Sequence, residues 1–465
     1  MVRHRPLRPG AVLDGTGIAA QAFDINNSAW LDISGFEVTN YTSPRPAGNA
    51  VNIHGSAHHV NLSNLLVHDN WNGIIMQDDA NHITIANTTV YHSRYGIGFE
   101  NTVHDITIDG AVSHDNGEIY YGPVSSYING DGFSDDAGTY NLTIRNSVAY
   151  NNLDAGFDIR AVGFSCTNCI SYDNFKYGFR LWDNGGPFTM VDSLAYGNGW
   201  FPLQLQRMGP RTYFYNCTFV GRSGDQGYAI DQSGSNVVVR NAIFAGFARR
   251  LSNGALTSVD DYSIYAPGPG QVEFALGPHS VRVDPLFADP AAGDYRLQPA
   301  SPAIDAGAPI EQAADLDGSP RPQGQEYDMG AYEYPSASPG AAPSITAVLN
   351  GAAFDRRLAP GAWIAVSGAN LALDGVSVSI GGTPAAIASI SPGLLKVLAP
   401  AALGDTALVP LEVTTPAGTA RTSVTFRQFA PAFFMRDTET AAARPRSTAW
   451  ISATSAPRPQ PCPAR

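Results

Sequence analysis

The sequence has few lysines, few charged residues and no long apolar run, and each shortage excludes a class of protein. Only 15% of the residues are charged, and acidic residues outnumber basic ones, which gives a formal net charge of −13. A chain without a basic surplus is a poor candidate for binding nucleic acid, because it cannot neutralise phosphates. No stretch of 18 consecutive apolar residues is present, so a membrane span is not expected. The two lysines, Lys176 and Lys396, leave nearly all positive charge to arginine.

Cysteine is also scarce, with four residues in 465. Cys166 and Cys169 have the spacing of a zinc or redox pair, but no second pair follows them. Four cysteines do not make a disulfide framework in a chain of this size, so buried or lightly bridged thiols are expected. The first residues lack the apolar segment of a signal peptide, so if the protein is exported, we expect its true N-terminus to be missing from this chain.

Glycine and proline are abundant, at 47 and 33 residues, which favours many short strands over long helices. Between about residues 30 and 250 a pattern recurs in which apolar alternation, an Asn, a second apolar stretch and a polar turn are followed by Gly and an apolar residue. Its copies are separated by 22 to 25 residues, apart from one spacing of 36. The residues that occupy the Gly position are Gly73, Gly96, Gly132, Gly156, Gly178, Pro202 and Gly227.

A period of this length, with two or three short strands in each copy, predicts an all-β fold, the right-handed parallel β-helix. Each coil of such a helix pairs with the next about 4.8 Å away. A second register is occupied mainly by Asn, which tolerates left-handed turns and hydrogen-bonds along a ladder. We expect these residues to be structural: Asn64, Asn87, Asn146, Asn168, Asn216 and Asn241, with Gly110 and Asp192 in the gaps.

The one long spacing contains about 13 extra residues, Gly117 to Asn129. Insertions into repeat proteins form loops on one face, often the binding face. Tyr120 and Tyr121 in this insertion would suit stacking on sugar rings, although a plain surface loop is an equally good interpretation.

Predicted domain boundaries follow from where the repeat ends. We expect an N-terminal segment or cap at 1–29, the β-helix at 30–279, a cap at 280–334, a linker at 335–343 and an Ig-like sandwich at 344–435. Residues 436–465 have no strand pattern and are expected to be a disordered or frame-shifted tail. Residues 280–334 resemble the choice-of-anchor tails of secreted bacterial β-helix proteins, and 344–435 resemble their Ig/IPT-type modules.

Alternation along the strands predicts which side chains face solvent. The predicted outward positions include Ser134, Asp158, Arg180, Gln204 and Ala229, and the same face carries Asp131, Asp154 and Lys176. The expected remainder of a saccharide groove is Trp182, Trp200, Gln204 and Arg207.

Three stacked carboxylates repel one another unless a cation lies among them, and oxygen-rich clusters suit Ca²⁺. Asp131, Asp154 and Asp158 are therefore candidate calcium ligands. The alternative is that these aspartates only cap turns.

The segments Asn129-Gly-Asp-Gly-Phe, Tyr150-Asn-Asn-Leu-Asp-Ala-Gly-Phe-Asp-Ile and Tyr177-Gly-Phe-Arg-Leu resemble the motifs of polysaccharide lyase family nine, the β-helical pectate lyases. This resemblance implies Ca²⁺ at Asp131, Asp154 and Asp158 and the catalytic base at Arg180. Ala155 and Arg180 depart from the family pattern, which has Asp and Lys there. Because Arg is hard to deprotonate, Lys176 is a second candidate base.

These expectations combine into a secreted or cell-surface monomer that cleaves an acidic polysaccharide by β-elimination. Ca²⁺ would acidify the C5 proton of a uronate, and Arg180 or Lys176 would remove it. A β-helical glycoside hydrolase is a second hypothesis. A third is a carbohydrate-binding surface protein without catalysis.

Overall fold

The computed structural model describes two regions built entirely of strands and connecting turns, with no α-helix among the described residues. No helix in this part of the chain has the length and apolar character to cross a membrane. The described residues are 10–427 apart from 19, 44–47, 118–128, 183–186, 207–211, 223–229, 234–235, 247–256, 267–275, 336–341, 352–357, 372–374, 392 and 404–405.

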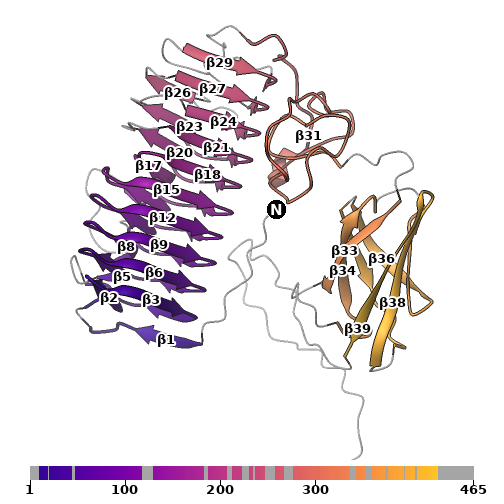
Figure 1. Cartoon of the computed structure of the whole chain (residues 1–465), viewed down its shortest axis with the longest axis horizontal. Helices are drawn as coiled ribbons and strands as arrows, with labels where there is room; N and C mark the ends of the chain where they lie inside the picture. Colours follow the sequence, from indigo (N-terminus) through magenta and orange to yellow (C-terminus); the bar gives the residue numbers. More distant parts are fainter. Residues whose placement is uncertain are drawn as a thin grey trace, which may run out of the picture.

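Three parallel sheets wind together into a solenoid, in which each coil contributes one strand to each sheet (Figure 1). Sheet A comprises β1 Ala11–Asp14, β4 Phe36–Thr39, β7 Leu66–His68, β10 Thr89–Tyr91, β13 Val112–His114, β16 Val148–Tyr150, β19 Ile170–Tyr172, β22 Leu194–Tyr196, β25 Thr218–Val220, β28 Ile243–Ala245 and β30 Ile264–Tyr265. Sheet B comprises β2 Phe23–Asn26, β5 Asn49–His54, β8 Asn72–Met76, β11 Ile97–Phe99, β14 Phe133–Asp135, β17 Ala155–Ile159, β20 Tyr177–Trp182, β23 Phe201–Gln206 and β26 Ile230–Ser233. Sheet C comprises β3 Ala29–Ser34, β6 His58–Ser63, β9 Asn81–Ala86, β12 His104–Asp109, β15 Tyr140–Arg145, β18 Phe164–Thr167, β21 Phe188–Val191, β24 Thr212–Tyr215, β27 Asn236–Arg240 and β29 Thr257–Asp261.

The predicted fold class is confirmed, and the solenoid starts earlier than expected. Strands β1 and β2 lie within residues 1–29, which the sequence suggested as a cap, and they pair with β4 and β5. At the other end the predicted register fails by two residues. Gln204 pairs with Asp231, two residues after Ala229, the position that a constant period gives, and Ala229 itself lies outside the described residues.

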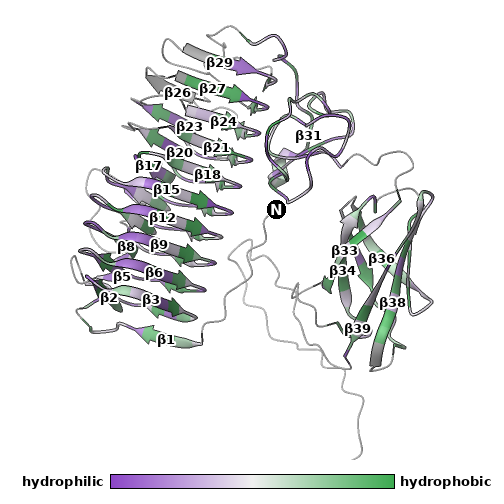
Figure 2. Ribbon diagram, in the orientation of Figure 1, coloured by the Kyte–Doolittle hydropathy of each residue, from purple (hydrophilic) through white to green (hydrophobic). Residues whose placement is uncertain are grey.

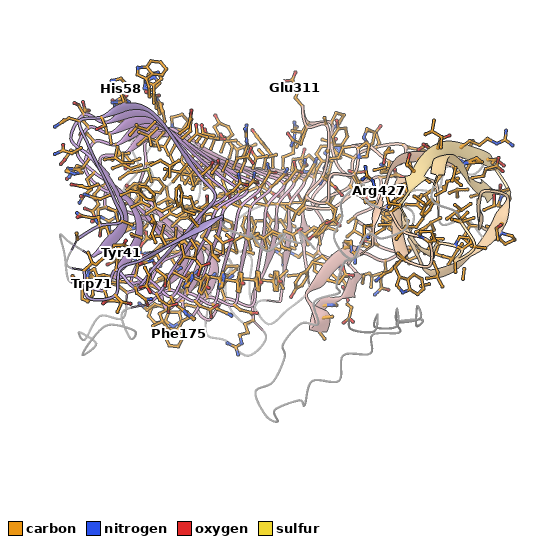
Figure 3. All side chains as sticks on the ribbon, turned by 90° about the horizontal axis from the view of Figure 1, so that it is seen from below. Tyr41, His58, Trp71, Phe175, Glu311 and Arg427 are labelled. Carbon is orange, nitrogen blue, oxygen red and sulfur yellow. The ribbon has the colours of Figure 1, made fainter. Side chains whose placement is uncertain are left out.

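The core is made by the residue that follows the repeated Gly, as the alternation predicts. Phe133, Phe157 and Phe179 are fully buried and stack with ring centroids 4.6 and 4.7 Å apart. Figure 2 shows hydrophobic residues recurring at the same place in successive strands, and Figure 3 shows side chains aligned in rows along the solenoid. Burial of one apolar row per sheet holds the coils in register.

Left-handed turns repeat at one corner of every coil. The predicted Asn register has positive φ throughout, from 46° to 71° when Asp192 and Gly110 are included. This result confirms the structural interpretation, because Asn, Asp and Gly adopt this conformation at the least cost.

A second Asn ladder, which the sequence reasoning missed, lies one residue after another row of left-handed turns. Asn116, Asn152 and Asn174 are almost fully buried, and each donates from Nδ2 to Oδ1 of the Asn on the next coil, ending at Asn198, with every distance 2.9 Å. The same Oδ1 atoms accept backbone N–H groups. Repetition of Asn at the coil period was the available signal.

The three described cysteines are free and buried, in agreement with the expectation of buried thiols. Cys166 and Cys169 lie in the solenoid core, and the Cys169 thiol donates to the carbonyl of Ile144 at 3.6 Å. Burial raises the pKa of Cys166 well above its usual value, which keeps that thiol protonated. Cys462 lies outside the described residues.

After the solenoid, a small irregular unit packs against sheet A. It contains β31 Phe287–Asp289, the 3₁₀ turn η2 Pro290–Ala292 and β32 Asp294–Leu297. Its Arg321 is fully buried, 3.1 Å from Asp192 of the solenoid and 2.6 Å from Glu333. A buried guanidinium needs such carboxylates, so this contact ties the unit to the coils.

The C-terminal region is an antiparallel sandwich with its own core, which includes Ile364, Val397 and Leu411. Its seven strands are β33 Ser344–Asn350, β34 Trp363–Ala369, β35 Ser377–Ile380, β36 Thr383–Ser391, β37 Leu394–Leu398, β38 Thr406–Thr415 and β39 Gly418–Phe426. The predicted tail, 436–465, lies outside the described residues.

The buried Asn ladder makes a testable contribution to stability. Asn152→Ala leaves the backbone N–H and the Nδ2 of Asn116 without their acceptor, so we expect a loss of about 1–3 kcal/mol for each unsatisfied buried group. Urea unfolding measures the loss. Thr167→Ala, on the solvent side of β18, is the control and should change stability by less than about 0.5 kcal/mol. Equal effects of the two substitutions would contradict the role of the ladder.

Candidate functional site

Sheet B carries a row of polar side chains on its outer face. Ser134 pairs with Asp158, Asp158 with Arg180, and Arg180 with Gln204, so consecutive coils of β14, β17, β20 and β23 place these residues side by side. These four residues thus share one register, as predicted, but Asp158 and Gln204 are buried and do not face solvent. Parallel pairing brings each side chain next to its neighbour without any specific loop.

Asp131 and Asp154 lie at the start of the same strands. Asp131 precedes β14, and its Oδ1 accepts the backbone N–H of Ala155 at 2.9 Å. Asp154 precedes β17, and its Oδ2 lies 3.0 Å from Nζ of Lys176 on the next coil. The other Asp154 oxygen, Oδ1, is buried without a hydrogen-bond partner.

A second ion pair, between Arg180 and Asp158, joins the neighbouring strands β20 and β17. Nη1 of Arg180 donates to Oδ2 of Asp158 at 3.1 Å, and its Nε donates to Oε1 of Gln204 at 3.1 Å. The indole N–H of Trp182 donates to Asp158 Oδ1 at 2.5 Å. Arg180 is thus held in one orientation by partners on both adjacent coils.

Aromatic rings frame the two cations. The guanidinium of Arg180 lies 5.1 Å from the ring centroid of Tyr177 and 4.3 Å from that of Trp182. The Lys176 ammonium lies 5.6 Å from the ring of Trp200, which is 48% exposed. Phe175, beside Lys176, is also at the surface (Figure 3). Exposed rings next to charged groups are a common setting for sugar binding.

Burial is the main influence on the charges of the cluster. It raises the pKa of Asp131 well above its usual value, and the carboxylates of Asp158 and Asp154 raise it further. Burial also raises the pKa of Asp154, although the hydrogen bond from Lys176 acts to lower it. In the same way burial raises the pKa of Asp158 to about 6, although the charge of Arg180 acts to lower it.

The pKa of Arg180 is shifted in the direction that keeps the guanidinium protonated. Burial acts to lower the pKa of Arg180, but the charges of Asp158 and Tyr177 outweigh burial, and the net shift is upward. Arg180 is therefore a fixed cation in this site.

The donor set does not fit the predicted Ca²⁺ well. Two of the three candidate ligands, Asp154 and Asp158, are already neutralised by Lys176 and Arg180. Within the described ranges no group of three His, Cys, Asp or Glu residues is arranged to hold a metal. Lys176 and Arg180 balance the charges of Asp154 and Asp158 without a divalent ion.

Three of the predicted substrate contacts, Tyr120, Tyr121 and Arg207, fall outside the described residues. The sequence reasoning missed Arg160, whose guanidinium lies 3.4 Å from the ring of Trp182. Its position two residues after Asp158, directly after the end of β17, was the available signal, since alternate residues of an extended chain share a face.

Two family models match the chain. Residues 49–219 match the right-handed β-helix region, and residues 358–427 match the IPT/TIG domain. The chain is a β-helix protein with a C-terminal IPT/TIG domain. The parallel β-helix and the IPT-type module predicted from the sequence are thus confirmed.

Curated relatives of this β-helix protein match over short stretches. Mannuronan C5-epimerase AlgE1 of Azotobacter vinelandii is 40% identical over 81 residues, which are 17% of this chain and 6% of the epimerase. Pectate lyase L of Paenibacillus polymyxa (strain SC2) is 25% identical over 164 residues, 35% of this chain and 30% of the lyase. The chain thus spans less than a third of either relative.

Among solved structures, that of pectate lyase Pel9A aligns over 70% of this chain and 86% of its own, with 14% identity and a TM-score of 0.41.

The raised pKa of Asp158 predicts a pH dependence of stability. A carboxyl with a folded-state pKa of about 6, above its ordinary 3.8, favours folding while it is protonated. This contribution is lost as the pH rises from about 4 to about 6, by at most about 1.4 kcal/mol per pH unit. Relative to Asp158→Asn, the wild type should therefore lose free energy of unfolding over this range. Chemical denaturation at several pH values, in EDTA, measures the difference.

Asp294 provides the control, because a hydrogen bond from Arg296 lowers the pKa of Asp294. It is ionised in the folded and unfolded states above pH 5, so Asp294→Asn should show no slope against wild type between pH 5 and 7. Parallel curves for wild type and Asp158→Asn would contradict the assignment of a raised pKa to Asp158.

Proposed function

We propose that this β-helix protein is a polysaccharide lyase that acts on an acidic, uronate-containing polysaccharide at the Lys176–Arg180 cluster. The observation that carries the proposal is the pair of cations, each held by a carboxylate of the adjacent coil, on the outer face of sheet B. Fixed positive charge beside exposed aromatic rings suits a uronate, whose carboxylate pairs with the cations and whose ring stacks on the aromatics.

Arg180 supplies the site for the uronate carboxylate. Its guanidinium is oriented by Asp158 and Gln204 and stays charged. A carboxylate bound to a fixed guanidinium withdraws charge from the neighbouring C5 atom, and this effect acidifies the C5 proton. The strongly held proton of Arg180 argues against its predicted role as the base.

Lys176 is the base in this proposal. An amine must lose its own proton before it can accept another, and Asp154 lies 3.0 Å away with a raised pKa. Asp154 is therefore the proposed acceptor of the proton that Lys176 gives up during the reaction. The unpartnered Asp154 Oδ1 is a further acceptor for that proton.

The proposed elimination moves one proton to Lys176 and breaks the C4–O bond of the uronate. The neutral amine of Lys176 takes the C5 proton, the C5–H electron pair forms the C4–C5 double bond, and the C4–O bond breaks. The glycosidic oxygen leaves with the electron pair of the broken C4–O bond and takes a proton from solvent. The products are an unsaturated uronate and a shortened chain.

The predicted Ca²⁺ at Asp131, Asp154 and Asp158 has no part in these steps, because two of those carboxylates hold Lys176 and Arg180. A calcium requirement stays a prediction, and so does secretion of the protein.

A second candidate reaction shares the first step. The match to mannuronan C5-epimerases at 38–40% identity favours it, because epimerisation at C5 also begins with loss of the C5 proton. The proton then returns to the opposite face, and the glycosidic bond stays intact.

The decisive assay measures ultraviolet absorbance of the unsaturated product on polygalacturonate, polymannuronate and polyguluronate, each with Ca²⁺ or with EDTA. Wild type should produce absorbance on at least one uronan. Lys176→Ala should lower kcat by about 10²–10⁴-fold, as expected for loss of a general base. Arg180→Gln should raise KM and also lower kcat, because Arg180 both binds the uronate carboxylate and acidifies the C5 proton. Lys396→Ala, which changes the other lysine, on β37 of the sandwich, is the matched control and should keep full activity.

Other outcomes would select other functions. Deuterium incorporation at C5 in D₂O without absorbance would select the epimerase. Release of reducing ends without absorbance would select the glycoside hydrolase, and binding without turnover would select the non-catalytic surface protein. Activity that disappears in EDTA would restore the calcium prediction.

A further inference from the structure

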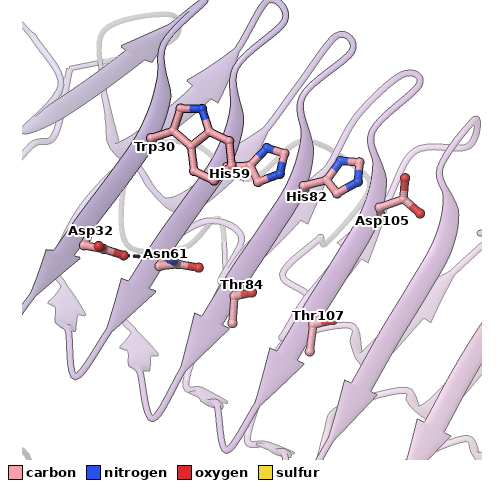
Figure 4. Close-up of a pocket in the computed structure, with 8 residues that line it drawn as sticks. All are labelled: Trp30, Asp32, His59, Asn61, His82, Thr84, Asp105 and Thr107. Atoms are coloured by element: carbon pink, nitrogen blue, oxygen red, sulfur yellow. Dashed lines mark hydrogen bonds between the residues drawn. The ribbon is translucent and has the colours of Figure 1, made fainter.

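A groove lies on the outer face of sheet C, near the N-terminal end of the solenoid (Figure 4). It has a volume of about 390 Å³ and crosses the first four strands of the sheet, β3, β6, β9 and β12. The residues that line it are Trp30, Asp32, His59, Asn61, His82, Thr84, Asp105 and Thr107. The Lys176–Arg180 cluster is on sheet B, so this groove is a separate surface.

One wall of the groove is an aromatic stack. Trp30 lies over His59 with ring centroids 4.0 Å apart, and His59 lies over His82 at 4.8 Å with nearly parallel rings. Trp30 is 74% exposed and sits in a left-handed turn with φ 62°. A large aromatic residue is rare in that conformation. A free indole face therefore stands at the groove edge, held by the turn and by the stacked imidazole.

The floor of the groove is a polar row on the strands. Asp32 pairs with Asn61, and Asn61 with Thr84, which pairs in turn with Thr107. Nδ2 of Asn61 donates to Oδ1 of Asp32 at 2.6 Å. Strand spacing repeats these hydrogen-bonding groups about every 4.8 Å, a distance comparable with the length of one sugar ring.

We infer that this groove binds a neutral polysaccharide. A pyranose ring presents an apolar C–H face, which fits the exposed indole of Trp30, and a rim of hydroxyls, which fits the carboxylates, amide and hydroxyls of the floor. The charge of the lining selects a neutral chain. None of the eight lining residues is Lys or Arg, whereas Asp32 and Asp105 are acidic, so a uronate would meet like charge.

The imidazoles support this choice of ligand. Burial lowers the pKa of His59, and the neighbouring rings of His82 and His58 lower it further. The imidazole of His59 is therefore uncharged near neutral pH and supplies no attraction for an acidic sugar. The solenoid would hold a neutral glycan on sheet C while sheet B acts on an acidic one.

Affinity gel electrophoresis with soluble neutral polysaccharides tests the inference. The probes are xyloglucan, galactomannan, mixed-linkage β-glucan and arabinan, with polygalacturonate and polymannuronate as acidic comparisons. At least one neutral polysaccharide should retard the protein, and Trp30→Ala should weaken this binding about tenfold or more, as loss of an aromatic anchor does. Trp200→Ala, which changes an exposed indole on sheet B, is the matched control and should bind the neutral chain as wild type does.

A second variant guards against a folding defect in Trp30→Ala. Asn61→Ala removes one floor group that is exposed, and it should weaken neutral-glycan binding while thermal unfolding is unchanged. Lyase activity should be unaffected in both variants, so failure of this inference is distinct from failure of the proposed function. No retardation by any neutral polysaccharide, or equal binding by wild type and Trp30→Ala, would overturn it. Trp30-dependent self-association in light scattering would also overturn it and would assign the surface to a second copy of the chain.

Discussion

Parallel pairing of one coil with the next is the constraint on which the rest of the solenoid depends. It places residues from the same position of successive coils about 4.8 Å apart, whatever their chemistry. Apolar positions thereby become stacked core rows, such as Phe133, Phe157 and Phe179. Buried Asn positions become a ladder in which each amide satisfies the next. Ionisable positions meet their neighbours in the same way, so a site forms wherever charged residues occupy one register on adjacent coils.

The same constraint explains why the cluster on sheet B is electrostatically strained. Asp131, Asp154 and Asp158 come from consecutive coils, and burial raises the pKa of each. Lys176 and Arg180 follow on the next coil and pair with the last two of these carboxylates. Ionisable residues with strongly shifted pKa values near solvent are frequent at functional sites. Such shifts raise the free energy of the folded state, and they persist only where the surrounding structure enforces them.

The sequence predicts the repeat well and the irregularities poorly. A period of 22–25 residues, with Gly before an apolar residue, is enough to place Asp158, Arg180 and Gln204 in one row. It fails at β26, where Gln204 pairs with a residue two positions later than a constant period gives, because loop length does not follow from strand pattern. The ion pairs and the Asn116–Asn198 ladder depend on side-chain direction at the coil corners, which alternation does not specify. The groove beside Trp30 was missed because its residues carry no catalytic motif and become neighbours only through stacking.

Two departures from the lyase motif, Ala155 and Arg180, are linked by this stacking. The backbone N–H of Ala155 donates to Asp131, so an Asp at this position would add a fourth carboxylate next to a carboxyl whose pKa is already raised by two others. With Ala there, that repulsion is absent, and Arg180 holds Asp158 by a charge-assisted hydrogen bond while a second nitrogen contacts Gln204. Both changes move the cluster toward internal charge balance, the first by removing negative charge and the second by fixing a permanent cation. Under the proposed lyase function, a cluster balanced in this way needs a divalent ion less than one with four carboxylates, because its negative charge is already compensated by Lys176 and Arg180.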